Sequence, residues 1–286
     1  DGRDGVFVDR VYAGGFHSMI IDSSAMPWSF GWNVRGQLGR RVQIASQPYR
    51  LVSLKYVRIR SAAAGHIHSL LLTDAQQVFV FGDNTYGQLG TGERGPKTSV
   101  YLPLRIPLGG KAVLQVAAGC VHSMALTQAG VYSWGYGGVG QLGHDDFLTH
   151  LAPKQIDLFE RLNLPVARLA CGCYHSFAVL EGGELYAWGY NAHGQLGLSD
   201  RLARGAPHRV WWFEVERRMV VQSVAAGEQF SLVLLEDGRL FSFGTNGAGQ
   251  LGIGAWEHPD GRELHSSDTP VEIKELRRKG IRHICA

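Results

Sequence analysis

Histidine–serine pairs are the first candidates for catalytic residues in this chain. They stand at His17-Ser18, His68-Ser69, His122-Ser123 and His175-Ser176, each pair three residues after a glycine. A histidine beside a hydroxyl is the base and nucleophile of many covalent hydrolases, which also need an acid to orient the imidazole. No acid recurs at a regular orienting position, and Phe230-Ser231 fills the same place in a fifth copy. The pairs therefore predict buried structural histidines that hydrogen-bond to the backbone of a neighbouring repeat.

Cysteine and glycine clusters are the other candidates for chemistry. The cysteines, Cys120, Cys171, Cys173 and Cys285, lack the paired spacing of a zinc site and are interpreted as small core residues without a disulfide framework. The run Gly135 to Gly140 looks like a dinucleotide fingerprint but lacks a following helix. We therefore expect no catalytic residue, no cofactor and no metal.

The histidine pairs belong to a repeat with a period near 50 residues. Each copy continues with an apolar run, a polar turn, an aromatic-glycine pair and a Gln-Leu-Gly tripeptide. The histidine-position residue stands 20 residues before its glutamine in four copies (17 to 37, 68 to 88, 175 to 195, 230 to 250) and 19 before it in the other (122 to 141). The glycine just before each glutamine is interpreted as a positive-φ or close-packing position, at Gly36, Gly87, Gly140, Gly194 and Gly249. Asparagine two residues after the aromatic-glycine pair is interpreted as a turn residue that tolerates a left-handed backbone, as at Asn33, Asn84, Asn191 and Asn246.

Each copy holds about four strands. Two β-rich runs around a Gly- or Asp-bearing turn predict a hairpin, a small-residue segment precedes it, and a proline-bearing segment typical of an edge strand opens the unit. The prolines are Pro48, Pro103, Pro153, Pro207 and Pro270. Four-stranded units repeated along a chain build a β-propeller. The prediction is an all-β fold, one propeller over residues 1–286 with units near 15–65, 66–119, 120–172, 173–227 and 228–286.

The motif A-A-G-x-x-H-S…W-G…G-Q-L-G resembles the repeat of the regulator of chromosome condensation family, from about Val6 to Ala286. The resemblance implies a seven-bladed β-propeller. Because only five full copies are present and the segment 281–286 aligns with an inner strand, we expect this chain to be part of a longer protein.

Composition sets wider limits. The net charge is +3 and the pI about 8.7, which is too mild to indicate nucleic-acid binding by itself. Nucleic acid therefore stays open as a weakly supported partner beside protein. Neither a signal peptide nor a transmembrane stretch is recognised, so no membrane contact is expected. The cysteine usage favours an intracellular, reducing compartment, with nucleus, cytoplasm and mitochondrion left open.

Departures from the repeat are where function is expected, because folds carry grafted sites. The first hairpin turn becomes Ser23 to Trp28, and two loops carry aromatic and charged residues of the kind that dominate binding hot spots. The candidate interaction residues are Trp211, Trp212, Arg217, Arg218, Trp256, His258, Asp260 and Arg262. The alternative for the loop that holds the tryptophan pair is that Trp211 and Phe213 cover a neighbouring blade.

Two functions fit these features. The first is a non-catalytic protein-interaction scaffold that binds its partners, including large assemblies, through propeller-face loops. The second is nucleotide exchange on a Ran-like small GTPase, which the resemblance implies for the founding member through an inserted β-wedge. No convincing wedge is found in this sequence. A plant UV-B photoreceptor would need a Gly-Trp-Arg-His-Thr motif, which this sequence lacks.

Overall fold

The computed structural model describes residues 7–215, 219–254, 265–277 and 279–286. The chain divides into two compact units, one of residues 1–136 and 149–155, the other of residues 137–148 and 156–286. Three four-stranded antiparallel sheets belong to the first unit and two to the second. The all-β prediction is confirmed, since helical structure is limited to the short helices α1 (Asp157–Arg161) and α2 (Trp212–Val215) and three single 3-10 turns among the described residues.

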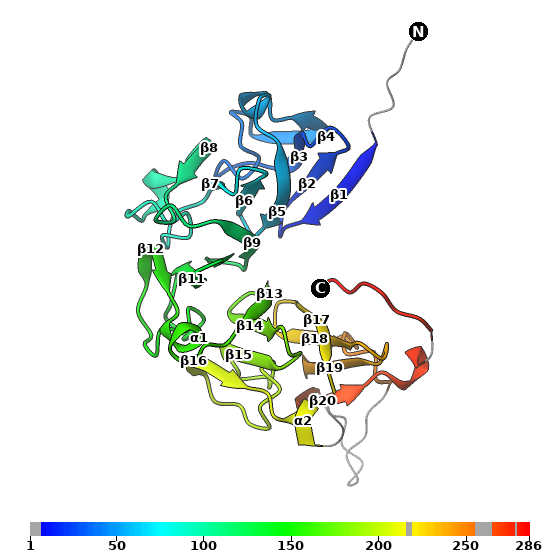
Figure 1. Ribbon diagram of the computed structural model, residues 1–286. Coiled ribbons are helices and arrows are strands. Elements are labelled where there is room, and N and C mark those ends of the chain that lie inside the picture. The colour runs from blue at the N-terminus through cyan, green and yellow to red at the C-terminus, as the bar shows by residue number, and fades with distance from the viewer. Residues whose placement is uncertain (1–6, 216–218, 255–264, 278) are drawn as a thin grey trace. The chain divides into compact units, whose positions relative to one another are not determined.

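The first unit holds twelve strands in chain order, four per sheet (Figure 1). They are β1 (Val8–Ala13), β2 (His17–Asp22), β3 (Pro27–Trp32) and β4 (Ile44–Arg50); β5 (Ile59–Ala64), β6 (His68–Thr73), β7 (Val78–Gly82) and β8 (Val100–Ile106); β9 (Val113–Ala118), β10 (His122–Thr127), β11 (Gly130–Gly135) and β12 (His150–Gln155). The second unit holds β13 (Val166–Cys171), β14 (His175–Leu180), β15 (Leu185–Gly189) and β16 (Arg204–Arg209), then β17 (Val221–Ala226), β18 (Phe230–Leu235), β19 (Leu240–Thr245) and β20 (Ser266–Glu272).

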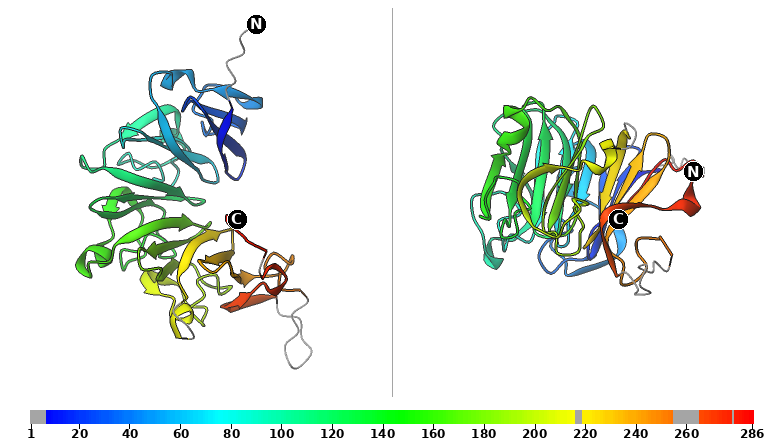
Figure 2. Two further views of the ribbon diagram at one scale, coloured as in Figure 1. Left: turned by 45° about the vertical axis from the view of Figure 1, so that its right-hand side comes forward. Right: turned by 90° about the horizontal axis from the view of Figure 1, so that it is seen from below.

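In three of the five sheets the second strand is buried along its whole length. All six residues of β6, β10 and β14 are buried, which explains why these strands read as continuous apolar runs instead of alternating patterns. Their neighbours supply the rest of the core, such as Phe81 on β7 and Trp134 on β11, which have no exposed surface. Each sheet is twisted, as Figure 2 shows from two sides.

The fourth strand of every sheet carries the proline that the sequence predicted for an edge strand. Pro48, Pro103, Pro153, Pro207 and Pro270 lie in β4, β8, β12, β16 and β20, and the pairing register of each of these strands shifts beside its proline. A proline cannot donate to the ladder, and a bulge turns the outer edge away from further pairing. The sequence repeats are offset from the sheets by one strand, because the small-residue strand before each glycine pairs with the hairpin that follows it.

The last segment of the chain differs from the expectation. Residues 281–286 form no strand, although their alignment predicted one. Ile281 and Ile284 instead pack beside the buried residues Leu234, Leu240 and Ile273 of the last sheet.

Candidate interaction surface

The repeated histidines join neighbouring sheets through serine hydroxyls. His17 Nε2 lies 2.7 Å from Ser69 Oγ, and that hydroxyl donates to the Gln37 carbonyl over 2.9 Å. The same chain of contacts links His68 to Ser123, where the nitrogen–oxygen distance is 3.0 Å. Because the serine proton is used on the carbonyl, the histidine must donate from Nε2. The partner is therefore a side chain of the next sheet, whereas the repeat pattern predicted backbone.

The second unit repeats this arrangement. His175 Nε2 lies 3.0 Å from Ser231 Oγ, which donates to the Gln195 carbonyl over 2.8 Å. Phe230 takes the histidine place in the last sheet, where it fills the same space without a donor. The histidine–serine contacts are buried, so no substrate reaches them, and they act as structural links between sheets.

Burial keeps the histidines neutral. Burial, aided by the charge of His66, lowers the pKa of His17 to about 4. Burial is also the main cause that lowers the pKa values of His68 and His122 to about 3. A neutral imidazole with its proton on Nε2 is the form that the serine contact requires.

The loop that ends in Gln-Leu-Gly is built around a buried asparagine. Asn33 Oδ1 accepts from Leu38 N over 2.7 Å, and its amide nitrogen donates to the carbonyls of Arg40 and Val42. Asn84, Asn191 and Asn246 accept from the corresponding leucine nitrogens. None of the four has a positive φ, so the interpretation as left-handed turn residues is wrong: asparagine is needed for its side-chain amide. The glycines Gly36, Gly87, Gly140, Gly194 and Gly249 do have positive φ, from 76° to 91°.

Three slots beside these invariant residues vary from copy to copy, and in the first unit several hold exposed rings. The first slot comprises the two positions between glycine and histidine, the second is the position after the aromatic-glycine pair, and the third is the position just before Gly-Gln-Leu-Gly. Phe16 and Trp32 meet edge to face with centroids 5.2 Å apart, and His66 of the next sheet contacts Phe16 at 4.9 Å. Tyr86 and Tyr136 form a second pair at 5.3 Å. We call these five residues the aromatic rim of the first unit.

The rim is accessible. Phe16 is 51% exposed, Trp32 39% and Tyr86 43%, although each is a large apolar group. The second unit carries rings in equivalent slots, at Tyr174, Tyr190 and His193. Sequence reasoning missed both sets because it placed function in the irregular loops, yet the variable positions inside an invariant motif are visible when the copies are aligned.

One charged pair lies beside the rim. Asp83 occupies the slot that Trp32 fills in the first sheet, and its carboxylate is buried. It accepts from Thr85 Oγ1 over 2.8 Å and from Gln88 Nε2 over 2.7 Å. Arg35 of the preceding sheet lies 3.6 Å away and is partly exposed. The first unit therefore carries, besides the aromatic rim, a partly exposed arginine held by a buried acid.

The residues predicted as an interaction site are only partly described. Trp211 is 59% exposed, with the Arg209 guanidinium 4.5 Å from its ring centroid. Phe213 is buried and packs against Phe241 of β19, so this phenylalanine covers the neighbouring sheet as the alternative expected, whereas the exposed Trp211 does not. Trp212 packs against both phenylalanine rings beside the core of the second unit. Arg217, Arg218, Trp256, His258, Asp260 and Arg262 lie outside the described residues.

The departure in the first hairpin turn is structural. Asp22 is buried and accepts from Ser24 N, Met26 N and Trp28 Nε1 at 2.9, 3.0 and 2.8 Å. Burial alone would raise the pKa of its carboxyl, but these hydrogen bonds outweigh burial and hold that pKa below the ordinary value. The acid thus organises the turn, where Ala25 takes a φ of 64°.

The cysteines differ from the expectation. Cys171 is a half-buried free thiol whose pKa is raised by burial, and Cys285 is free and exposed instead of filling the core. Cys120 and Cys173 are each disulfide-bonded. The expectation of no disulfide is therefore wrong, and the cysteines no longer support a reducing compartment.

Metal sites and membrane-spanning helices are two further classes of feature. Among the described residues, no three histidine, cysteine or acidic side chains gather as metal ligands would. Within the same part of the chain, no helix has the length and apolar character to cross a membrane.

Comparison with known proteins identifies the family. The profile of the RCC1-like domain matches residues 2–286, and the chain belongs to this family. The resemblance to the regulator of chromosome condensation repeat is therefore confirmed. The fold is similar to that of Prp20p from Saccharomyces cerevisiae, with a TM-score of 0.81 and 25% identity over 96% of this chain and 67% of that one. The fold is also similar to that of human WBSCR16, with a TM-score of 0.80 and 25% identity over 94% of this chain and 67% of that one.

Curated relatives are longer than this chain. The ultraviolet-B receptor UVR8 of Arabidopsis thaliana is 30% identical over 87% of this chain and 56% of its own length. The probable E3 ubiquitin-protein ligase HERC6 of Homo sapiens is 33% identical over 92% and 26%, and Protein RCC2 of Mus musculus 31% over 84% and 51%. The chain thus spans between a quarter and just over half of these relatives.

Proposed function

We propose that this chain is a non-catalytic scaffold that binds protein partners through the loops at the ends of its sheets, with the aromatic rim as a contact surface. The observation that carries the proposal is the contrast between slots. The invariant positions of the repeat are buried and structural, whereas the variable slots beside them hold exposed rings. Function grafted on a repeat fold is expected at such positions.

The chemistry of the rim suits a protein ligand. Exposed aromatic groups that adjoin one another are uncommon on a monomer surface and mark interaction sites. Tryptophan, tyrosine and arginine also dominate the binding energy of protein interfaces. Trp32, Tyr86 and Arg35 supply these three residue types within the first unit. Trp211 over Arg209 stays a proposed second contact, on the second unit.

Known structures support a protein ligand class. One describes yeast RCC1 bound to Kap60, and another reports the binding of Prp20p to Gsp1p and histones. These statements concern those proteins alone. For this chain they favour protein partners over nucleic acid, in agreement with the mild net charge.

Nucleotide exchange on a Ran-like small GTPase is the second candidate. It rests on the similarity to Prp20p, whose reported ligands include Gsp1p. An exchange factor needs no chemical catalyst, since it binds the GTPase in competition with the nucleotide. A scaffold and an exchange factor thus both need a surface that binds a protein. They differ because only the exchange factor causes its bound partner to release a nucleotide. An intracellular location and membership in a longer seven-bladed ring remain parts of the proposal.

Paired surface variants test the scaffold. The double variant Phe16→Ala/Trp32→Ala removes one ring pair of the rim, and Trp211→Ala removes the ring of the proposed second contact; all three side chains are exposed. Pull-downs with each form, followed by quantitative mass spectrometry, should show at least a ten-fold loss of specific partners for the rim variant, since hot-spot rings contribute about 2 kcal/mol or more.

The outcomes separate the two candidate functions. Unchanged recovery with the rim variant and a loss with Trp211→Ala would contradict the rim and leave the second unit as the contact surface. A small GTPase recovered in near-equal amount calls for a nucleotide-release assay. Faster release with the unaltered chain, lost with the rim variant, would establish nucleotide exchange instead of the plain scaffold.

A further inference from the structure

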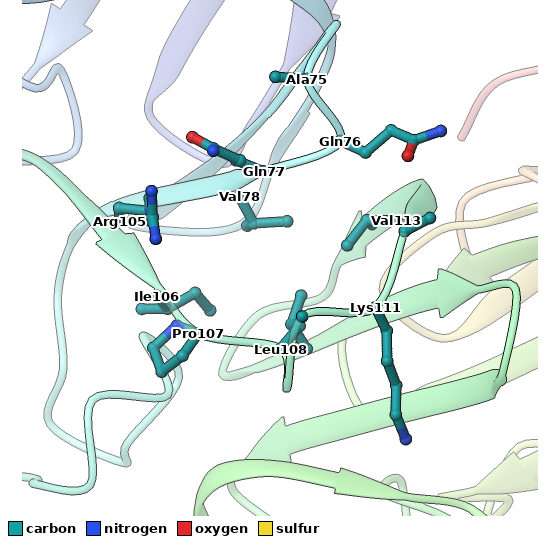
Figure 3. A pocket seen from close by; sticks show the side chains of 12 residues that line it. Ala75, Gln76, Gln77, Val78, Arg105, Ile106, Pro107, Leu108, Lys111 and Val113 are labelled. Atoms are coloured by element: carbon teal, nitrogen blue, oxygen red, sulfur yellow. The ribbon is translucent and has the colours of Figure 1, made fainter.

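A pocket of about 290 Å³ lies in the first unit, between the turn that joins β6 to β7 and the segment that joins β8 to β9 (Figure 3). Its apolar walls are the buried side chains of Val78, Ile106, Leu108 and Val113. Arg105 also lines it. The pocket shares no residue with the aromatic rim.

Arg105 has equivalents in all five sheets. It stands near the end of an outer strand and pairs across the ladder with Phe79. In the other sheets the same register pairs Trp28 with Arg50, Tyr132 with Gln155, Tyr186 with Arg209 and Phe241 with Glu272. An aromatic residue therefore always faces a long polar one at this position.

The charged members of this series have internal counter-charges. Arg209 lies 3.6 Å from Glu184, and Arg50 lies 3.9 Å from Asp22. Glu272 forms a bidentate pair with Arg277, which lowers the pKa of the Glu272 carboxyl, and the charge of Arg239 lowers that pKa further. Arg239 stands where Glu184 stands in the preceding sheet. Gln155 is uncharged and bonds Tyr132 Oη.

Arg105 is the exception. The place of Glu184 is taken by Gln77, which lies two residues before Phe79 just as Glu184 lies two before Tyr186. Among the described residues, Arg105 makes neither an ion pair nor a side-chain hydrogen bond. The nearest acid along the turn, Asp74, is already paired with Arg58 at 3.0 Å. The Arg105 guanidinium at the pocket thus lacks the carboxylate partner that Arg50 and Arg209 have.

We propose that this pocket binds an acidic, apolar segment of a partner protein: a carboxylate pairs with Arg105, and an adjoining aliphatic side chain enters the cavity. The inference goes beyond the proposed rim and does not depend on it. A guanidinium fits a carboxylate through two parallel hydrogen bonds. The volume is near the lower end of about 300–1,000 Å³ for ligand sites, which suits one or two side chains.

A nucleic acid fits the pocket less well. Phosphate binding needs several cations, but the other cation of the pocket, Lys111, is committed elsewhere. Its ammonium donates to Tyr132 Oη and lies 3.5 Å from Gln155 Oε1, and Figure 3 shows its side chain turned away from Ile106 and Leu108. One arginine above an apolar floor matches a carboxylate beside a hydrocarbon group.

The second unit contains a built-in comparison. A pocket of about 320 Å³ occupies the equivalent place there, lined by Glu184, Arg209, Phe213 and Met219 among others. Its arginine already has an internal acid. Gln77→Glu should therefore convert the first pocket to the paired form, and Glu184→Gln should convert the second pocket to the unpaired form.

Peptide titration followed by NMR tests the proposal on the full chain. The probes are the capped peptides acetyl-Ala-Leu-Glu-Ala-amide and acetyl-Ala-Leu-Gln-Ala-amide, observed through methyl signals of Val78, Leu108 and Val113 and through Arg105 Nε–H. The glutamate peptide should give saturable shifts, with about ten-fold weaker binding for the glutamine peptide, as expected for loss of a charged hydrogen bond. Gln77→Glu should weaken binding of the glutamate peptide to the same degree, and the melting temperature of the protein should not change.

Three results would overturn the assignment. Equal affinity for both peptides would remove the role of Arg105, and undiminished binding by Gln77→Glu would remove the argument from the missing acid. A short single-stranded oligonucleotide that shifts Arg105 without moving the methyl signals, while the glutamate peptide shifts neither, would make the site an anion site for phosphate.

Discussion

At the scale of the residue, the glycine three positions before each histidine is required by the imidazole that lies on it. A Cβ added at Gly65 would stand 2.3 Å from a ring carbon of His68 and 2.5 Å from the Gly119 carbonyl. The same clash would occur at Gly172 with His175, and at Gly227 with the Phe230 ring. The histidine position therefore requires a planar ring that packs against the Cα of the glycine. Phenylalanine meets this requirement, which explains why it can replace histidine there.

Gly65→Ala should be strongly destabilising, because backbone as well as the imidazole would have to move. Overpacking of this kind costs about 1–3 kcal/mol, and displacement of the His68–Ser123 contact adds about 1 kcal/mol. Gly247→Ala is the matched control: nothing lies within 4 Å of the added Cβ, and its φ is not positive. Urea unfolding should show a clear loss of free energy for the first variant and a change within about 0.5 kcal/mol for the control. Equal effects would mean that the glycine–imidazole contact is not the reason for the motif.

At the scale of the element, each sheet has a fourth strand that carries a proline, and the first hairpin adds a device of its own. Asp22 supplies the acceptors for the turn between β2 and β3. An exposed acid at a turn has little effect on stability, whereas a buried one with several donors leaves those donors unpaired when it is removed.

Asp22→Ala should therefore lower the free energy of unfolding by about 2–3 kcal/mol, because Ser24, Met26 and Trp28 lose their acceptor. Asp74→Ala removes an exposed acid from the next hairpin and should cost at most about 1 kcal/mol. Chemical unfolding at pH 7 compares them. Because its folded-state pKa is depressed, the Asp22 contribution should be complete above the ordinary carboxyl value of 3.8 and be lost as the pH falls below it. A milder effect for Asp22→Ala than for Asp74→Ala would refute this account.

At the scale of the whole molecule, the histidines make stability depend on pH. His17, His68 and His122 have folded-state pKa values of about 3 to 4 against an ordinary value of 6.5. Between these values the unfolded chain binds more protons than the folded one, so the free energy of unfolding must fall as the pH falls. The contribution is complete above pH 6.5 and is lost on acidification towards pH 4.

Urea midpoints at about pH 7.5, 5.5 and 4.5 should decrease in that order, with each histidine contributing up to about 1.4 kcal/mol per pH unit in this range. The variant His68→Phe copies the natural choice at Phe230 and should show a shallower dependence on pH, although it is less stable at neutral pH because Ser123 loses its donor. An unchanged slope would show that His68 does not titrate on unfolding.

Much of the fold was predictable from the sequence because it is repeated locally. Hairpin turns, small residues before the glycine and prolines on edge strands are signals that act within about 50 residues, and each recurs along the chain. Repetition separates the invariant positions from the variable ones, so strands and family followed. The asparagine role was mistaken because its partners are backbone groups brought close only by the folded loop.

The aromatic rim and the unpaired arginine were decided by tertiary structure. Phe16 and His66 are far apart in sequence and meet because neighbouring sheets place their first turns side by side within one unit. Arg105 looks like any surface arginine until the register shows which residue stands opposite it and which acid is missing. The repeat, the strands and the family can be recognised without a structure, since these depend on local periodicity. Contacts between sheets decide which side chains meet on the surface and which charged groups have no ion-pair partner. Only the folded structure sets these contacts.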